Sequence, residues 1–180
     1  QGMPAVAMDP NGDFVVVWQS DGQDGSSYGV YAQLYNNMGQ AQGSEFRVNT
    51  YTTGAQGMPA AAMDSNGNFV VIWQSDGQDG SSYGNYAREY NYTGQAQGSE
   101  FQVNTYTMGT QAMPAVAMDA NSNFVVVWQS DGQDEDGYGI FAQCYDSQTF
   151  AEFPTNILLV ALMTIISIII LKSYENSRQM

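Results

Sequence analysis

Histidine is absent from the sequence, and Cys144 is its single cysteine. Without histidine the chain has no Ser-His-Asp or Cys-His nucleophile and no ordinary zinc site. A G-x-x-x-x-G-K-[ST] phosphate loop is also missing. A lone cysteine forms no disulfide within the chain, so packing has to stabilise the fold. We expect Cys144 to be a small buried hydrophobic residue, because it lies in an alternating run beside Tyr145.

Basic residues are scarce: 4 Lys and Arg oppose 18 Asp and Glu, which gives a formal net charge of −14. Binding of nucleic acid requires Lys and Arg to displace counterions, so no nucleic-acid partner is expected. Carboxylates for glycoside hydrolysis are numerous, but Arg47 and Arg88 are too few for the arginine cluster of a sialidase-like propeller. We therefore expect a protein that is not an enzyme. Its acidic surface suits cations and extracellular solvent.

A repeat of 55 residues organises the chain. "QGMPAVAMD" begins at Gln1, "QGMPAAAMD" at Gln56 and "QAMPAVAMD" at Gln111. Repeat periods of about 40 to 50 residues are typical of propeller blades, and this period lies just above them. We expect β repeats at residues 1–55, 56–110 and 111–146, the third without its last strand, followed by a linker at residues 147–153. Because the first residue falls inside the repeat pattern, we expect the chain to be the C-terminal piece of a longer protein.

Each repeat contains the pattern of several short strands. "PAVAMD" leads into Asn11-Gly12, which indicates a two-residue hairpin turn. The run 14–18 is apolar on both faces and predicts a buried strand. Residues 30–35 alternate with a period of two, and a short run follows at 45–49. No helical periodicity is present within the repeats.

This pattern predicts an all-β fold of tandem four-stranded repeats, forming the blades of an incomplete β-propeller. A tandem sandwich and a β-solenoid are the alternatives. A tryptophan ends the buried run of each repeat, and we expect it to pack each sheet against the next repeat. The three tryptophans are Trp18, Trp73 and Trp128.

A long apolar run, "ILLVALMTIISIIIL", follows the repeats at residues 157–171. A helix that begins at Pro154 and ends at Lys172 is long enough to cross a bilayer. The basic residues Lys172 and Arg178 then mark residues 173–180 as a cytoplasmic tail. We expect a single-pass protein of the cell membrane with extracellular repeats, and a possible glycosylation site at Asn91, in Asn-Tyr-Thr. A buried core helix or two buried strands are the alternatives for this segment.

An Asp-x-Asn-x-(Asp/Asn) cluster recurs in every repeat. Alternating oxygen side chains in a tight turn are the beginning of a calcium loop, although no Glu follows at the twelfth position. Asp and Asn are also the residues that a hairpin turn prefers, so a purely structural role is the alternative. The candidate calcium ligands are Asp9, Asn11, Asp13, Asp64, Asn66, Asn68, Asp119, Asn121 and Asn123.

A second acidic cluster is the Gly-rich loop "SDGQDG", which becomes "SDGQDEDG" in the third repeat. The third copy has diverged but keeps both aspartates. A tyrosine borders each loop, and tyrosine beside flexible glycine and serine suits the recognition of sugar or protein. The candidate ligand residues are Asp21, Asp24, Tyr28, Asp76, Asp79, Tyr83, Asp131, Asp134 and Tyr138. A solvated loop without a ligand is the alternative.

The stretch "NGDFVVVWQSDGQDGSSYGVYAQLY" resembles repeats of very large bacterial and protist surface or secreted proteins, which often accompany cadherin-like or haemolysin-type calcium-binding modules. The resemblance covers residues 1 to about 146 and implies an extracellular, adhesin-like role. We therefore predict a membrane-anchored protein for recognition of a protein or carbohydrate, or for adhesion, with calcium as a candidate structural ion. A structural spacer and a degenerate glycosidase-like propeller are the alternatives.

Overall fold

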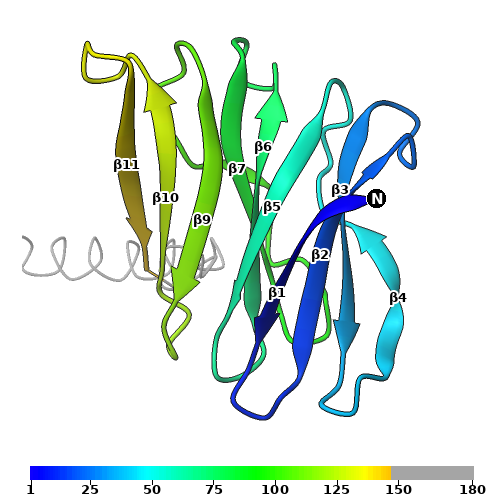
Figure 1. Cartoon of the computed structure of the whole chain (residues 1–180). Helices are drawn as coiled ribbons and strands as arrows, with labels where there is room; N and C mark the ends of the chain where they lie inside the picture. The colour runs from blue at the N-terminus through cyan, green and yellow to red at the C-terminus, as the bar shows by residue number, and fades with distance from the viewer. Residues whose placement is uncertain (147–180) are drawn as a thin grey trace, which may run out of the picture. The chain divides into compact units, whose positions relative to one another are not determined.

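The computed structural model describes residues 1–146, which form three antiparallel sheets (Figure 1). We call the sheets blades 1, 2 and 3. Blade 1 contains β1 (Gly2–Met8), β2 (Phe14–Asp21), β3 (Tyr28–Tyr35) and β4 (Ala41–Arg47). Blade 2 contains β5 (Gln56–Met63), β6 (Phe69–Asp76), β7 (Tyr83–Tyr90) and β8 (Phe101–Gln102). Blade 3 contains β9 (Gln111–Met118), β10 (Phe124–Asp131) and β11 (Tyr138–Tyr145).

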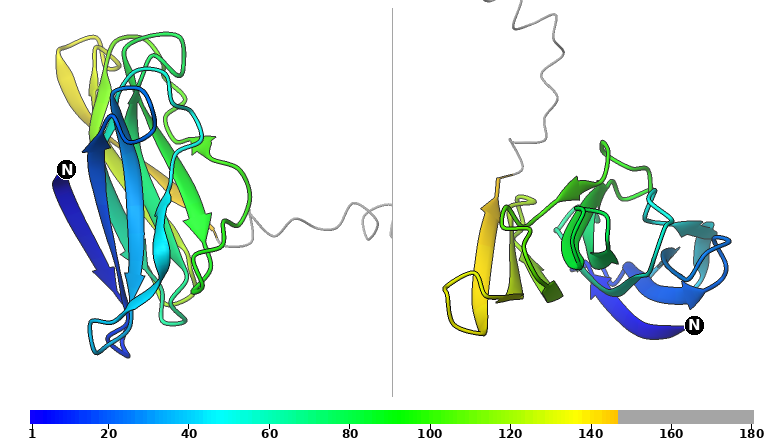
Figure 2. Two further views of the ribbon diagram at one scale, coloured as in Figure 1. Left: turned by 90° about the vertical axis from the view of Figure 1, so that its right-hand side faces the viewer. Right: turned by 90° about the horizontal axis from the view of Figure 1, so that it is seen from above.

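Every blade is a meander in which each strand pairs with its sequence neighbour. Blades 1 and 2 have four strands and blade 3 has three within the described residues, as the repeat pattern predicts. Among the first strands of the blades, β1 contacts β5 and β5 contacts β9, and the blades fan out from them (Figure 2, right). This arrangement agrees with the expected β-propeller-like fold.

The predicted linker, membrane helix and tail at residues 147–180 lie outside the described residues. Within residues 1–146 there is no helix long and apolar enough to cross a membrane.

The hairpin between β1 and β2 differs from its prediction. Met8 pairs with Phe14, so the loop contains five residues, and the predicted two-residue turn at Asn11-Gly12 is wrong. The Asp9 amide donates to the Asp13 carbonyl (2.9 Å), and Gly12 adopts a left-handed φ of 88°. The five-residue loop is held by the Asp9 side chain, which accepts hydrogen bonds from the backbone N–H groups of Asn11 and Asp13.

The core lies between the blades. Alternate residues of β2 and β3 in blade 1 face Phe69, Val71 and Trp73 of blade 2. The blade 1 residues in this cluster are Ala7, Val15, Val17, Val30, Ala32, Leu34 and Val48. Trp73 is fully buried there, so it packs against the preceding repeat, and the expectation that it packs against the next repeat is wrong. Successive side chains of a strand point to opposite faces, so Trp73 lies on the other face of β6 from Val70 and Ile72. The face with Trp73 is the one that packs on blade 1.

Buried amide side chains connect consecutive blades. The amide oxygen of Asn49 accepts from the Val30 backbone N–H (2.7 Å), and its NH₂ donates to the Tyr51 carbonyl (2.7 Å) and to Gln56 (3.3 Å). Asn104 repeats these bonds with Asn85, Tyr106 and Gln111. Asn49 and Asn104 are 1% and 3% exposed. We call each set an asparagine latch, since it ties the last segment of one blade to the start of the next.

Candidate functional site

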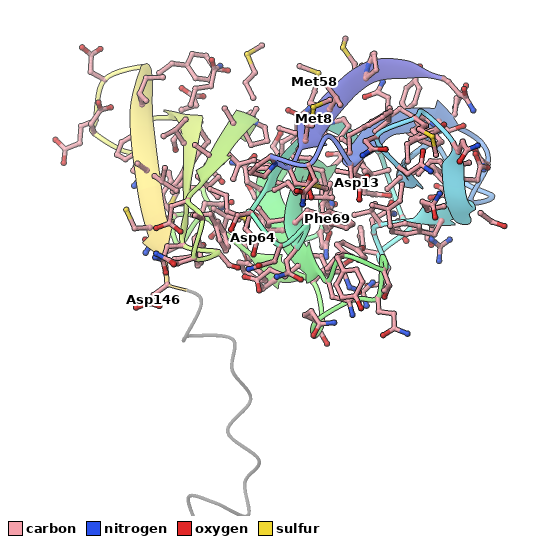
Figure 3. All side chains as sticks on the ribbon, turned by 90° about the horizontal axis from the view of Figure 1, so that it is seen from below. Met8, Asp13, Met58, Asp64, Phe69 and Asp146 are labelled. Carbon is pink, nitrogen blue, oxygen red and sulfur yellow. The ribbon has the colours of Figure 1, made fainter. Side chains whose placement is uncertain are left out.

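The Asp-x-Asn turns of the three repeats lie on one edge of the blades, the edge seen from below in Figure 3. They line a common hollow of about 380 Å³, whose walls are Met8, Asp9, Pro10, Met63, Asp64, Ser65, Met118, Asp119 and Ala120. The structure therefore brings together Asp9, Asp64 and Asp119, one from each predicted calcium cluster. Among the described residues, however, no group of three acidic or other metal-ligating side chains is arranged to hold a metal ion.

The aspartates of these turns hold the backbone. Asp9 accepts from the backbone N–H of Asn11 (2.8 Å) and of Asp13 (3.0 Å) through the same carboxylate oxygen. Asp64 and Asp119 accept equivalent bonds in blades 2 and 3. Asn11 and Asp13 are exposed, and Asp13 accepts from the Asn37 backbone N–H (2.8 Å). This is the geometry of a side chain that closes a hairpin, as the structural alternative predicts.

Asp64 has further donors. The amide of Asn68 donates to its second oxygen (2.9 Å), and so does the Ser122 hydroxyl from blade 3. Burial raises the pKa of the Asp64 carboxyl, but the hydrogen bonds from Ser122, Asn68 and Asn66 outweigh burial and bring this pKa below its ordinary value. Hydrogen bonds from Asn123 and Asn121 likewise lower the pKa of Asp119. These carboxylates thus already accept several hydrogen bonds within their turns, and binding of calcium at Asp9, Asp64 and Asp119 stays a prediction.

The predicted glycosylation site lies on the same edge. Asn91 belongs to the turn after β7, and its amide oxygen accepts from Thr93 (2.7 Å to the hydroxyl) and from the Gln95 backbone N–H (2.9 Å). The amide nitrogen, which would carry a glycan, makes one long bond of 3.4 Å to Gln95. Tyr92, beside it, is 68% exposed. Modification of Asn91 stays a prediction.

The Gly-rich loops lie on the opposite edge, between the second and third strand of each blade (Figure 1). Asp24 folds back over its own loop. One of its carboxylate oxygens accepts from the Ser26 backbone N–H (3.1 Å), and the other lies 2.7 Å from the position that a Gly29 Cβ would occupy. Asp79 and Asp134 have the same relation to Gly84 and Gly139. The carboxylates of the predicted ligand residues Asp24, Asp79 and Asp134 therefore lie over a glycine of their own hairpin. Gly29 consequently has no room for a side chain.

The other predicted ligand residues form pairs at the mouth of each hairpin. Asp21 lies directly opposite Tyr28, Asp76 opposite Tyr83 and Asp131 opposite Tyr138. Side chains of directly opposed residues share one face of a sheet, so each blade presents a carboxylate beside an aromatic ring. Tyr28 is 38% exposed and Tyr138 62%, whereas Tyr83 is half-buried. We call these the acid–tyrosine pairs.

Sequence reasoning missed a second acidic position near the loops. In blade 2, Glu100 accepts from the Gln78 side chain (2.8 Å) and from the backbone N–H groups of Thr50 and Tyr51. In blade 1, Glu45 accepts from Gln23 (2.7 Å). The exact 55-residue spacing of Glu45 and Glu100 was the available signal.

Carboxylates near the loops affect a buried tyrosine in blade 1 and in blade 2. Burial, followed by the negative charges of Asp79 and Glu100, raises the pKa of Tyr86 to about 12. Burial and the charge of Asp24 also raise the pKa of Tyr31 above its ordinary value. Both tyrosines therefore stay neutral at physiological pH and do not supply a base.

The arrangement of the strands is similar to that of several solved structures. An endo-arabinase of Bacteroides thetaiotaomicron VPI-5482 matches with a TM-score of 0.49 at 13% identity, over 80% of this chain and 55% of the arabinase. A protein of unknown function from Dyadobacter fermentans matches with a TM-score of 0.54 at 16% identity, over 78% of this chain and 36% of that protein. A fucose lectin of Kordia zhangzhouensis matches with a TM-score of 0.43 at 13% identity, over 80% of this chain and 92% of the lectin.

These likenesses concern the arrangement of the strands. The chain spans about half of the arabinase and about a third of the Dyadobacter protein. Neither a protein-family model nor a curated protein matches the sequence.

Proposed function

We propose that this protein is a membrane-anchored extracellular protein that recognises a neutral or cationic carbohydrate without catalysing a reaction, and that the acid–tyrosine pairs make the contact. The observation that carries the proposal is the repeated opposition of Asp21 and Tyr28, which recurs in all three blades. An exposed ring can stack on the apolar face of a sugar, while the adjacent carboxylate accepts hydrogen bonds from its hydroxyl groups.

The negative charge of the repeats restricts the charge of the sugar that can bind. Residues 1–146 hold 16 Asp and Glu and only two basic residues, Arg47 and Arg88. An anionic sugar would be repelled by this surface and would find no arginine pair to bind its carboxylate. A neutral or amino sugar suffers neither penalty.

The binding test uses the full chain in detergent micelles on an array of neutral, cationic and anionic glycans. We expect binding to neutral or amino sugars, and an affinity lower by about tenfold or more in Tyr28→Ala and in Asp21→Asn. Tyr92→Ala is the matched control, since Tyr92 is an exposed tyrosine (68%) in a turn outside the pairs. A Tyr28→Ala affinity equal to that of the wild type, or no binding to any glycan, would contradict the proposal. The latter result would favour the structural spacer.

The membrane orientation is tested separately. In the double variant Ser26→Cys, Cys144→Ser, the only thiol lies in an exposed loop of blade 1. A membrane-impermeant maleimide should label this variant on intact cells as strongly as on permeabilised cells. Labelling only after permeabilisation would show that the repeats face the cytoplasm.

A further inference from the structure

Both ends of the three-blade unit expose apolar faces. The face of blade 1 that points away from blade 2 contains Val6 and Met8, each 60% exposed. We call it the leading face, and it also includes Phe14, Val16, Trp18 and Tyr35.

The face of blade 3 that points away from blade 2 contains Ile140, which is 78% exposed. We call it the trailing face, and it also includes Val125, Val127, Ala142 and Cys144. The expectation that Cys144 is buried is therefore wrong, because nothing within residues 1–146 packs on this face.

The same positions are buried elsewhere in the chain. Counterparts of Phe14, Trp18 and Tyr35 lie 55 residues later in blade 2, where they are 1%, 0% and 3% exposed. These are Phe69, Trp73 and Tyr90. Counterparts of Val127, Ile140 and Cys144 lie in blade 1, where they are 0%, 0% and 8% exposed; these are Val17, Val30 and Leu34. The leading face thus corresponds to the face of blade 2 that packs on blade 1, and the trailing face to its partner surface on blade 1.

The polar contacts between blades have free counterparts at the two ends. The side-chain oxygen of Gln19 accepts from the Met58 backbone N–H (3.0 Å), and Gln74 accepts from Met113 (3.3 Å). Met58 and Met113 adopt the uncommon left-handed φ values of 50° and 51°. Met3 holds the same conformation, with a φ of 48°, on the leading edge. Gln129 occupies the corresponding acceptor position in blade 3.

The buried carboxylate of blade 2 has no counterpart at the equivalent position of the trailing face. In blade 2 the position facing blade 3 that corresponds to Leu34 is Glu89, whose burial is unfavourable. The trailing face has the neutral Cys144 at this position. When the leading face of a second copy packs on blade 3, it therefore contacts the neutral Cys144 where blade 2 has the carboxylate of Glu89.

We propose that the trailing face of one copy of this chain binds the leading face of a second copy. The chain makes this interface twice within itself, between blades 1 and 2 and between blades 2 and 3, so a second copy carries the complementary surfaces. A head-to-tail interface of this kind either closes into a ring or continues as an open filament.

A cysteine cross-link tests the pairing of the faces. Within the chain, Leu34 Cδ1 lies 2.9 Å from the position that a Gly94 Cβ would occupy. Their counterparts are Cys144 on one copy and Gly39 on the other. In the full-length variant Gly39→Cys, oxidation with copper phenanthroline should join Cys144 of one copy to position 39 of the other. Mass spectrometry of the linked peptides identifies the pair, and adding Cys144→Ser should remove it.

Gly43→Cys is the matched control. Gly39 and Gly43 have nearly equal φ values of 74° and 73°, so both substitutions impose similar backbone strain. Gly98, the counterpart of Gly43, has no atom within 4 Å of its Cβ position, so position 43 should not reach Cys144. Equal cross-linking of the two variants would overturn the proposal. A ladder of linked species beyond two copies would support the contact and show that it continues as an open filament.

The mass of the full chain in detergent micelles, measured by light scattering, gives the second readout. We expect two or more copies for the wild type. Ile140→Glu should yield single copies, with association weaker by about a hundredfold, because a charge would be buried in the contact. Ile140 is exposed in the single copy, so this variant should keep the wild-type circular dichroism spectrum. Tyr92→Glu, at an exposed site on neither face, should remain paired. A single-copy wild type, or pairing unaffected by Ile140→Glu, would overturn the proposal.

Discussion

At the residue scale, the three repeats place different side chains in one environment. Position 34 in blade 1 is a leucine that packs in the core, and the same position in blade 2 is Glu89. One carboxylate oxygen of Glu89 is buried and has no hydrogen-bond partner among the described residues. Burial raises the pKa of Glu89 to about 7. Glu89 is thus a local weakness that the neighbouring repeats avoid.

Glu89 gives blade 2 a pH-dependent stability. Below about pH 4.5, the ordinary pKa of this carboxyl, it is protonated in both the folded and the unfolded chain. As the pH rises toward 7 the unfolded chain ionises first, so the free energy of unfolding falls. Allowing for partial solvent screening, we expect Glu89→Leu to raise that free energy by about 1–2 kcal/mol at pH 8. Urea unfolding at pH 4 and pH 8 measures both values.

Glu89→Gln is the control for this pH effect. It removes the ionisation but keeps a polar side chain in the interface, so it should flatten the pH dependence while adding less stability than leucine. A wild-type and Glu89→Leu difference that stays constant between pH 4 and pH 8 would contradict a role for ionisation of this residue.

Glu135 is a second residue that differs from its counterparts. Blades 1 and 2 have Gly25 and Gly80 in a left-handed conformation at this loop position, whereas blade 3 has Glu135 with a φ of 68°. A side chain in this conformation costs about 1 kcal/mol. We expect Glu135→Gly to raise the free energy of unfolding by up to about 1 kcal/mol in urea. Glu135→Ala removes the same charge but keeps the strain, so an equal gain in both variants would assign the effect to charge.

At the scale of elements, the asparagine latches hold consecutive blades together. The strands of each blade pair through their own backbones, but the segment between blades depends on Asn49 and Asn104, whose side chains satisfy buried backbone groups. Such groups are costly to leave unpaired in the interior. The latches therefore determine how firmly one blade packs on the next.

Removal of one latch should be strongly destabilising. Asn104→Ala leaves the Asn85 N–H and the Tyr106 carbonyl without the partners that now lie 2.6 Å and 2.8 Å away. We expect the free energy of unfolding to fall by about 3 kcal/mol in urea. Asn36→Ala is the control, since Asn36 accepts similar bonds from Met38 and Gln40 in an exposed turn and should cost no more than about 1 kcal/mol. If the two variants lose similar amounts of unfolding free energy, the latch stabilises the fold no more than an exposed turn does.

At the scale of the whole molecule, net charge opposes folding. The charge of −14 is spread over a small unit, and its self-repulsion is screened by salt. We expect potassium chloride to raise the thermal unfolding midpoint of the chain. The Asp-x-Asn carboxylates already accept hydrogen bonds within their turns. We therefore expect calcium chloride to act through ionic strength, with the same shift as potassium chloride at matched ionic strength.

A specific calcium site has a different signature. It would raise the midpoint at millimolar calcium well beyond the effect of matched potassium chloride, and a chelator would reverse the rise. Asp64→Asn would then remove the additional shift, because Asp64 is the aspartate of these turns with the most donors to exchange for an ion.

Much of this fold was predictable because its determinants are local. The period of 55 marks the blades, and the apolar run before each tryptophan marks the central strand. Blade 3 has three strands within residues 1–146, where the repeat pattern stops. The candidate site was harder to predict from the sequence. Asp21 and Asp24 look alike in the sequence, yet Asp21 opposes Tyr28 at the hairpin mouth while Asp24 turns back over Gly29. A loop conformation separates them, and no short pattern encodes it.

The sequence by itself determined the repeats, their strands, the alternation of faces along each strand and the acidic surface, since each depends on residues close together in the chain. Only the tertiary structure decided which neighbour each face meets. It showed that Trp73 packs on the preceding blade and that Asp9, Asp64 and Asp119 line one hollow. It also showed that Ile140 and Cys144 lie on a face that nothing within residues 1–146 covers. Packing between blades joins residues about one repeat apart, and local sequence cannot specify which of two apolar faces is covered.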